Sequence, residues 1–247
     1  TARHQFGRLG RLMKKEKYTA IVLAAGQGKR MKSKTQKQFL LLEDKPVLYY
    51  SLKAFEDSFI DSVILVAAED DIKYCQQEIV NRYGFKKVVS IVAGGKERYH
   101  SVLNGIKAAG ECDYIFIHDG ARPFVTQDML ARLLETVKES HACVAGMPVK
   151  DTIKIADDNG FIATTPKREL VWMIQTPQVF DFALIQKAYL KLEKDEYSLL
   201  QKGISITDDA MVVEMLLGEK VKLVEGSYQN IKITTPEDLA IAEGFLD

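Results

Sequence analysis

Short apolar runs alternate with helical periodicity along most of this chain, and that alternation limits the folds it can adopt. Residues 18–25, 62–68 and 114–117 predict buried strands, and Val102 and Ile106 recur at helical spacing between two of them. Strands that are apolar on both faces suit a sheet covered by helices on each side. The sequence therefore predicts an α/β fold with a doubly wound, mostly parallel, Rossmann-like sheet. Ligands of such sheets bind beyond the carboxyl ends of the strands.

The alternation stops at about residues 149–165. Two short strand patterns, residues 149–156 and 160–165, meet at a turn that contains Asn159-Gly160, and Asn-Gly is a strong hairpin signal. An isolated hairpin is marginally stable in water, so its apolar side chains need a second surface. Those side chains are Ile153, Ile155, Phe161 and Ile162. We expect a β-arm that projects from the sheet and packs against another subunit, giving a homodimer.

The charge balance argues against several classes of partner. Thirty-four basic residues offset thirty-four acidic ones, so the molecule has no net field to attract nucleic acid or an anionic membrane. Three separated cysteines without metal-ligand spacing favour a reducing compartment. No apolar stretch has the length of a membrane span or the position of a secretory signal. We expect a cytoplasmic protein that binds neither nucleic acid nor membranes.

The first seventeen residues differ from the rest of the chain. Residues 1–17 carry six Arg or Lys side chains against a single acidic residue, Glu16, and show no core periodicity. We expect a disordered or vector-derived extension, followed by a single domain over residues 18–247, because α/β folds of this size are often one unit.

The first predicted strand ends at Ala24 and runs into a loop rich in glycine and positive charge. Gly26 and Gly28 leave room for backbone N–H groups to approach phosphate oxygens, and Arg30 supplies charge. A dinucleotide fingerprint would place a small residue near Met31, and a P-loop would read GxxxxGK[ST], so neither motif matches. Cations suit a triphosphate, although the loop alone is equally consistent with an ordinary strand-to-helix turn.

Later strand ends carry further residues of unusual type. They are found in AGGKERYHSV, HDGARPF and NIKIT, and the chain also contains LAAGQGKRM, KQF, PVKDTIK, TPQVF and TDDA. With these motifs the sequence closely resembles the 2-C-methyl-D-erythritol 4-phosphate cytidylyltransferases of the non-mevalonate isoprenoid pathway. The resemblance runs from Tyr18 to the C-terminus and implies a nucleotidyltransferase domain.

The resemblance implies a reaction between CTP and a phosphorylated polyol. A phosphate oxygen of 2-C-methyl-D-erythritol 4-phosphate would attack the α-phosphorus of CTP, giving 4-diphosphocytidyl-2-C-methyl-D-erythritol and pyrophosphate. Such chemistry needs cations and positioning more than a general base. By motif position, Arg30 and Lys37 would hold the triphosphate, Lys232 would reach the attacking phosphate, and Mg²⁺ would be held mainly by the CTP phosphates and not by protein ligands.

The resemblance also implies which residues bind each substrate. Backbone and small side chains would read the nucleotide at Ala24, Ala25, Gly26, Gly28, Gly94, Gly95 and Ser101. The acceptor would be held by Asp119, Arg122, Thr152, Arg168, Thr176 and Thr207, with the arm residues acting across the dimer interface. Thr207 is equally well explained as a helix N-cap. His118 is expected to be structural. The family commonly has proline where this chain has Gln36, so we expect a more mobile loop before Lys37.

Three other functions fit parts of the sequence. A ribitol-5-phosphate cytidylyltransferase would share the nucleotide loop, but PVKDTIK and the spacing from Arg168 to Trp172 resemble the methylerythritol branch. A Rossmann-type NAD-dependent oxidoreductase is disfavoured by the missing third glycine and by the lysines after it. A non-catalytic nucleotide sensor is also consistent with the sequence.

Overall fold

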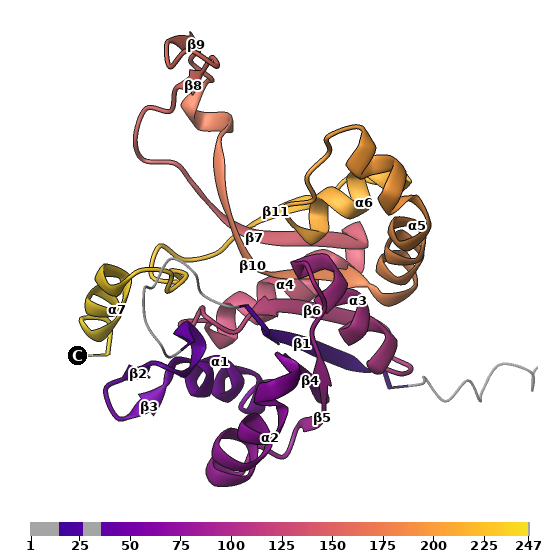
Figure 1. Ribbon diagram of the computed structural model, residues 1–247, viewed down its shortest axis with the longest axis vertical. Coiled ribbons are helices and arrows are strands. Elements are labelled where there is room, and N and C mark those ends of the chain that lie inside the picture. Colours follow the sequence, from indigo (N-terminus) through magenta and orange to yellow (C-terminus); the bar gives the residue numbers. More distant parts are fainter. Residues whose placement is uncertain (1–14, 27–35, 247) are drawn as a thin grey trace, which may run out of the picture.

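The computed structural model describes residues 15–26 and 36–246 (Figure 1). Its main sheet has seven strands in the order β11-β7-β10-β6-β1-β4-β5. The strands are β1 (Tyr18–Ala24), β4 (Ser62–Ala67), β5 (Val88–Ala93), β6 (Tyr114–Asp119), β7 (Ala142–Pro148), β10 (Trp172–Asp181) and β11 (Lys222–Glu225). Neighbouring strands are parallel except that β10 runs antiparallel to both β6 and β7. The predicted doubly wound, mostly parallel sheet is confirmed.

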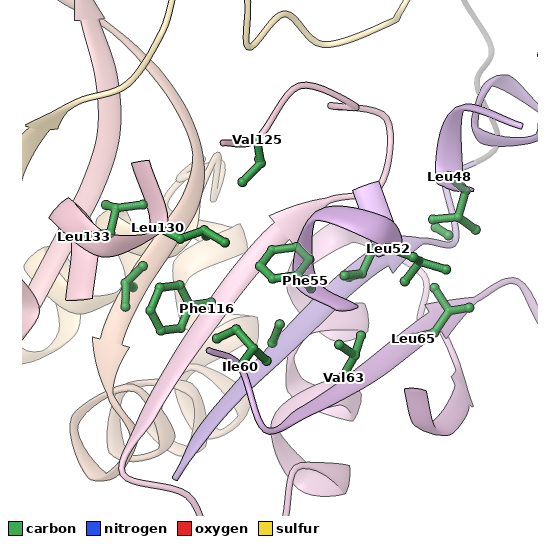
Figure 2. Close-up of a cluster of buried hydrophobic side chains, with 14 of the residues drawn as sticks. Leu48, Leu52, Phe55, Ile60, Val63, Leu65, Phe116, Val125, Leu130 and Leu133 are labelled. Carbon is green, nitrogen blue, oxygen red and sulfur yellow. The ribbon is translucent and has the colours of Figure 1, made fainter. Parts of the chain in front are cut away.

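Helices cover both faces of this sheet, and the strand side chains alternate between them. One face is covered by α1 (Val47–Glu56), α4 (Gln127–Ser140) and the helical segment α2–η4 (Ile72–Tyr74 and Cys75–Asn81), and the other by α3 (Arg98–Ala108), α5 (Phe182–Gln201) and α6 (Asp209–Leu217). In β1, Ala20 and Val22 point to the first face and Ile21 to the second. Figure 2 shows the first core, to which α1 contributes Phe55 and β6 contributes Phe116. This alternation explains why the strands are apolar throughout.

The connection between β4 and β5 was not predicted as helical. A short 3₁₀ turn, η3 (Glu69–Asp71), leads into α2, which continues as the π-helical segment η4. Cys75 and Ile79 bury one side of this segment against the first core. Many polar residues separate the apolar ones in this segment, so the sequence pattern did not predict a helix there.

The order of the strands opens a crevice at one end of the sheet. From β1 the chain moves outward through β4 to β5, and then returns to β6 on the other side of β1. The connections that follow β1 and β6 therefore lead toward opposite edges of the sheet, and ligands bind at such a point in open α/β sheets. The C-terminal helix α7 (Pro236–Glu243) lies beside α1 near this end of the sheet, where Ile233 and Ala242 pack with Leu42 and Val47 (Figure 1).

The predicted β-arm projects from the sheet between β7 and β10 (Figure 1). Its paired strands, β8 (Ile155–Ala156) and β9 (Ile162–Thr164), are shorter than the sequence patterns suggested. Gly160 takes the left-handed backbone conformation, φ 84°, that the turn requires. Phe161 is 72% exposed and Ile162 65% exposed. Pairing is short because none of the described residues covers these apolar side chains of the hairpin.

Residues 15–17 contact the sheet at its other end. The Glu16 carboxylate accepts hydrogen bonds from Lys138 and from the Tyr18 hydroxyl, and the Lys17 carbonyl accepts one from the Asp113 backbone N–H. Within the described residues, none of the helices combines the length and the apolar character needed to span a bilayer.

Candidate active site

A cavity of about 390 Å³ lies at the carboxyl ends of β1 and β6. Its walls come from the loop after β1, the 3₁₀ turn η2 (Lys37–Phe39), the start of α3, the end of β6 and the segment before α7. Eight predicted site residues line it: Ala24, Ala25, Gly26, Lys37, Gly95, Ser101, Asp119 and Lys232. Segments far apart in the sequence therefore meet at the expected edge of the sheet. Gly28 and Arg30 lie outside the described residues.

One wall of the cavity requires glycine. A Cβ atom on Gly94 would lie 2.4 Å from the Ala25 Cβ and 2.9 Å from the Ser101 Oγ, and one on Gly95 would lie 2.3 Å from the His100 Cβ. The Gly95 N–H donates to the Ser101 Oγ at 3.0 Å. Backbone and small side chains thus form this wall, and a flat base can approach it closely.

Lys37 lies beside the end of β1 because its neighbours are anchored there. Gln38 is 1% exposed, and its amide nitrogen donates to the Ala24 carbonyl at 2.6 Å and to the Gln36 side chain. Gln36 in turn donates to Asp71 in η3. Polar contacts hold Gln36 at the position where the resembled family commonly has a proline. The predicted mobility of this loop stays a prediction.

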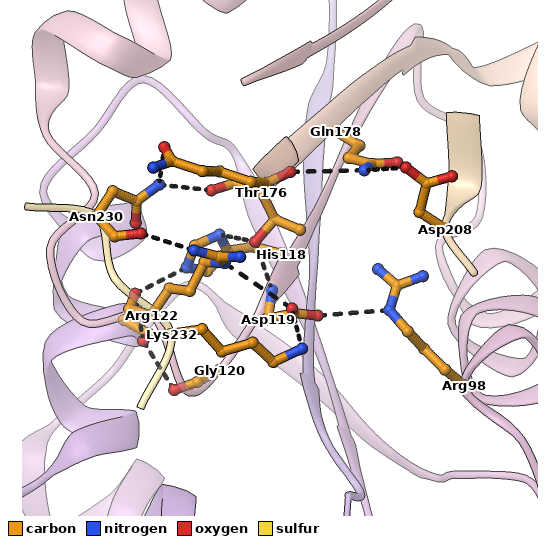
Figure 3. Close-up of polar contacts among 12 residues, drawn as sticks. Arg98, His118, Asp119, Gly120, Arg122, Thr176, Gln178, Asp208, Asn230 and Lys232 are labelled. Carbon is orange, nitrogen blue, oxygen red and sulfur yellow. Dashed lines mark hydrogen bonds and ion pairs between the residues drawn. The ribbon is translucent and has the colours of Figure 1, made fainter. Parts of the chain in front are cut away.

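Asp119 is the centre of the charged groups in the cavity (Figure 3). Its carboxylate lies 2.7 Å from the Lys232 Nζ, 3.5 Å from the Arg98 Nε and 3.9 Å from the Arg122 Nε. Burial by itself would raise the pKa of Asp119, but the three cations hold that pKa well below its usual range. Asp119 therefore stays ionised at neutral pH and holds cations in place, and it has no proton to donate.

Behind Asp119, a chain of hydrogen bonds ends at a fully buried histidine. The Thr176 hydroxyl oxygen accepts from the Asp119 backbone N–H at 3.0 Å and lies 2.9 Å from the His118 Nδ1. The other ring nitrogen lies 3.0 Å from the Arg122 carbonyl oxygen. The hydroxyl therefore donates to Nδ1, and Nε2 carries the ring proton. Burial lowers the pKa of His118 to about 4, so the ring is neutral, and its predicted structural role is confirmed.

Arg98 and Asp209 form a charged pair to which the sequence reasoning assigned no role. Two guanidinium nitrogens of Arg98 donate to the two carboxylate oxygens of Asp209 at 3.0 and 2.8 Å. Asp209 is completely buried, and it also accepts from the Tyr189 hydroxyl. The side-chain oxygen of Gln178 accepts from the backbone N–H groups of Asp209 and Ala210. One feature of the sequence could have indicated this pair. Arg98 is the first residue of α3, and the helix dipole disfavours a cation at that end of a helix unless an acidic partner is near.

Five predicted acceptor residues do not line this cavity, and two of them, Arg122 and Thr176, lie behind it in the contacts around Asp119. Thr152 and Arg168 are exposed in the segments of the projecting arm, where Arg168 donates to the Lys150 carbonyl at 3.3 Å. Thr207 is exposed and precedes the N-cap of α6, which is Asp208. The alternative account of Thr207 as the N-cap is therefore wrong, because the Asp208 carboxylate accepts from the Met211 N–H.

Comparisons with known proteins agree over nearly the whole chain. A sequence profile of the IspD family, 2-C-methyl-D-erythritol 4-phosphate cytidylyltransferase, matches residues 18–247. The enzyme of that name from Lachnoclostridium phytofermentans is 51% identical over 231 residues, which cover 94% of this chain and 97% of the relative. The one from Geobacter metallireducens is 47% identical over 232 residues, covering 92% and 96%.

Solved structures give the same result. The crystal structure of 4-diphosphocytidyl-2C-methyl-D-erythritol synthase from Anaerococcus prevotii matches with a TM-score of 0.78 at 32% identity, covering 94% of this chain and 96% of that one. The 2-C-methyl-D-erythritol 4-phosphate cytidylyltransferase from Thermus thermophilus matches with a TM-score of 0.70 at 30% identity, covering 93% and 98%.

Proposed function

The chain belongs to the 2-C-methyl-D-erythritol 4-phosphate cytidylyltransferase family, and on that premise we propose how its residues divide the work of the reaction. It is a nucleotidyltransferase of isoprenoid biosynthesis that transfers a cytidylyl group from CTP to 2-C-methyl-D-erythritol 4-phosphate. One observation carries the assignment of roles: a glycine-walled cavity and a group of cations around Asp119 share one end of the sheet.

The reaction exchanges one phosphorus–oxygen bond for another. An oxygen of the acceptor phosphate bonds to the α-phosphorus of CTP while the bond to the β-phosphate breaks, and pyrophosphate leaves with the electron pair. A phosphate monoester is largely ionised at neutral pH, since its second pKa is about 6, so no protein base has to activate it. The ionised Asp119 agrees with this, because it acts as a counter-charge to the cations.

On the nucleotide side, the proposed contacts follow the shape of the cavity. The wall of Gly94 and Gly95 receives the cytosine ring together with Ala24, Ala25 and Ser101, because only small groups allow that approach. Gly26 and Gly28 offer backbone N–H groups to the phosphates. Lys37 and Arg30 neutralise charge that builds on the phosphoryl oxygens in the transition state.

On the acceptor side, Lys232 lies between the two substrates. Its ammonium is held by Asp119 at 2.7 Å and faces the cavity. We assign it to orienting the attacking phosphate. Arg122 is mostly buried beside the Asp119 carboxylate, and the buried Thr176 accepts from the Asp119 backbone N–H, so we assign both to holding Asp119, whose carboxylate a polyol hydroxyl contacts. Thr207, exposed just before α6, is assigned to the polyol as well.

We propose that Mg²⁺ enters with CTP. Among the described residues, no group of three or more His, Cys, Asp or Glu side chains is arranged to hold a metal ion. Two carboxylates line the cavity: Asp119 already faces three cations, and Glu97 caps α3 by accepting from the His100 backbone N–H. The arrangement fits an ion bound by triphosphate oxygens, where it would neutralise part of the charge on the phosphates.

We also propose that the active form is a homodimer. The arm carries apolar side chains that remain exposed in one chain, and such a surface is stabilised by a second copy. Thr152 and Arg168 would then reach the acceptor bound in the partner subunit's cavity. A cytoplasmic location is proposed from the balanced charge and the three separated cysteines.

A pyrophosphate-release assay tests the function. The protein is supplied with CTP, Mg²⁺ and either 2-C-methyl-D-erythritol 4-phosphate or ribitol 5-phosphate, with UTP and ATP as nucleotide controls. We expect turnover with CTP and the methylerythritol phosphate. Preference for ribitol 5-phosphate would overturn the acceptor assignment, and no turnover with either acceptor would overturn the enzymatic role.

A further inference from the structure

Asn230 lies two residues before Lys232, and its side chain is completely buried. Its amide nitrogen donates to the Thr176 carbonyl oxygen at 2.9 Å and to the Gln175 side-chain oxygen at 3.1 Å (Figure 3). Its backbone carbonyl accepts from the Arg122 guanidinium at 2.7 Å. This one residue therefore ties the segment that carries Lys232 to β10 and to the loop after β6.

The contacts of Asn230 show what its side chain is used for. The two oxygen partners of the amide nitrogen are acceptors, and the Met129 sulfur, a weak acceptor, lies 3.8 Å from the same nitrogen. Both N–H bonds of the amide are therefore used there, and the orientation of the amide follows from them. The amide oxygen is buried and has no hydrogen-bond partner among the described residues. An unpaired buried acceptor costs free energy. Because Asn230 is present despite this cost, both hydrogen bonds that its amide nitrogen donates to oxygen acceptors are required.

The position of Lys232 depends on the segment that Asn230 anchors. Lys232 is followed by Ile233, whose N–H donates to the Ala121 carbonyl at 2.9 Å, and the Lys232 ammonium meets Asp119 at 2.7 Å. Lys232 thus lies between two anchored residues, Asn230 on its N-terminal side and Ile233 on its C-terminal side. A displacement of about 1 Å in such a group can lower turnover by about a hundredfold.

We propose that Asn230 is a positioning residue for the cytidylyl transfer: by donating to Thr176 and Gln175 it fixes the place of Lys232 relative to Asp119. The inference rests on the proposed role of Lys232 in orienting the acceptor phosphate. Asn230 itself has no surface in the cavity and acts only through its neighbours.

Steady-state kinetics and a double-mutant cycle test the inference. Asn230→Ala removes both donors, and Gln229→Ala changes the exposed neighbouring residue as a matched control. We expect Asn230→Ala to lower kcat/KM for the phosphopolyol about 10- to 100-fold, with the Kd for CTP within about twofold of the wild-type value. Gln229→Ala should match the wild type. A folded Asn230→Ala variant with wild-type kinetics overturns the inference.

The cycle separates positioning from general support of the fold. In a Lys232→Met background, Asn230→Ala should cause no further loss of rate, because the group that it positions is gone. If Asn230→Ala lowers kcat/KM by the same factor in both backgrounds, Asn230 acts independently of Lys232. That result would overturn the inference and leave the proposed role of Lys232 intact. Full activity of Lys232→Met would overturn the proposed role of Lys232 and the inference with it. If Asn230→Ala does not fold, Asn230→Ser, which keeps one donor, replaces it with the same expected outcomes.

Discussion

The cavity around Asp119 and the β-arm are stabilised in opposite ways. In the cavity, buried charges are paired within one chain, and the carboxylate of Asp119 faces three cations. In the arm, Phe161 and Ile162 are 72% and 65% exposed, and only a few residues pair. The cavity therefore holds its side chains in place within one chain, whereas the proposed homodimer would give the arm a second surface. If the proposed homodimer forms, one half of the site is preformed in each chain and the other half is obtained by association.

The first way to test the preformed half is to remove Lys37. Its ammonium is expected to interact more strongly with the transition state than with bound CTP, so Lys37→Ala should lower kcat by about a hundredfold or more and change CTP affinity less. Single-turnover kinetics and CTP titrations measure both quantities. Lys73→Ala, an exposed lysine of α2, is the control. A higher KM with normal kcat would instead assign Lys37 to ground-state binding.

The second prediction concerns the dependence of the arm on a partner. Phe161→Asp places a charge on the exposed apolar surface of both copies, so the Kd for dimerisation should rise by about a hundredfold or more. The melting temperature of the domain should change little. Analytical ultracentrifugation over a dilution series measures the Kd. Tyr197→Asp, at an aromatic residue of α5 that is 76% exposed, controls for added surface charge. Unchanged dimerisation in Phe161→Asp would remove the arm from the interface.

The third prediction uses the buried histidine behind Asp119. The pKa of His118 is lowered from 6.5 to about 4, so the unfolded chain binds a proton at higher pH than the folded one. Stability is therefore lost as the pH falls from about 6.5 to about 4, and the loss between pH 7 and pH 5 should be about 2 kcal/mol, or about 30-fold in the folded-to-unfolded ratio. Urea unfolding at fixed protein concentration measures it.

The control compares two histidine variants by how steeply their free energy of unfolding changes with pH. His118→Gln should remove most of this loss whatever it does to stability at pH 7. His141→Asn, at an exposed histidine with φ 63° that asparagine tolerates, should leave the slope near its wild-type value. An equal slope in His118→Gln would show that His118 does not titrate as its burial implies.

The fourth prediction joins the two regions. If arms cross between subunits, Lys37→Ala and Arg168→Ala place their defects on opposite halves of a shared site. Mixed dimers then contain one intact site and one doubly defective site, so random equal mixing should recover roughly a quarter of wild-type activity. Activity after subunit exchange, with exchange followed by mass spectrometry, measures this. Mixtures that exchange and stay inactive would place Arg168 in its own chain's site.

Local patterns in the sequence predicted most of the elements. The helix α7 begins at Pro236 after the Thr235 N-cap, and proline followed by acidic residues is a local signal for the start of a helix. The hairpin turn at Gly160 was also predicted. The helical segment α2–η4 was missed because many of its residues are polar, although Ile72, Cys75 and Ile79 recur at helical spacing. The role of Thr207 as an N-cap was wrong because Asp208, one residue later, has the capping geometry.

Most of the predicted nucleotide residues were placed together because they follow strands of one sheet. Parallel strands bring their carboxyl ends to the same edge of the sheet. Ala24 and Asp119 lie close because β1 and β6, which end at these residues, are neighbouring parallel strands. The arm residues were harder to place. Nothing in a single chain says how far Arg168 lies from a cavity that belongs to another copy.

The sequence by itself determined the sheet, its covering helices, the glycine-lined edge and the family, because periodicity, turn chemistry and motif spacing are local properties. Only the tertiary structure decided which charges are paired. Arg98 and Asp209 are 111 positions apart, and their bidentate contact exists because α3 and α6 pack against the same face of the sheet. The pKa of Asp119 is depressed by cations that include Arg98 and Lys232 from distant segments, against the effect of burial, and the pKa of His118 is depressed by burial itself. Electrostatic environment depends on distances in three dimensions, and those distances are fixed only when the core is packed.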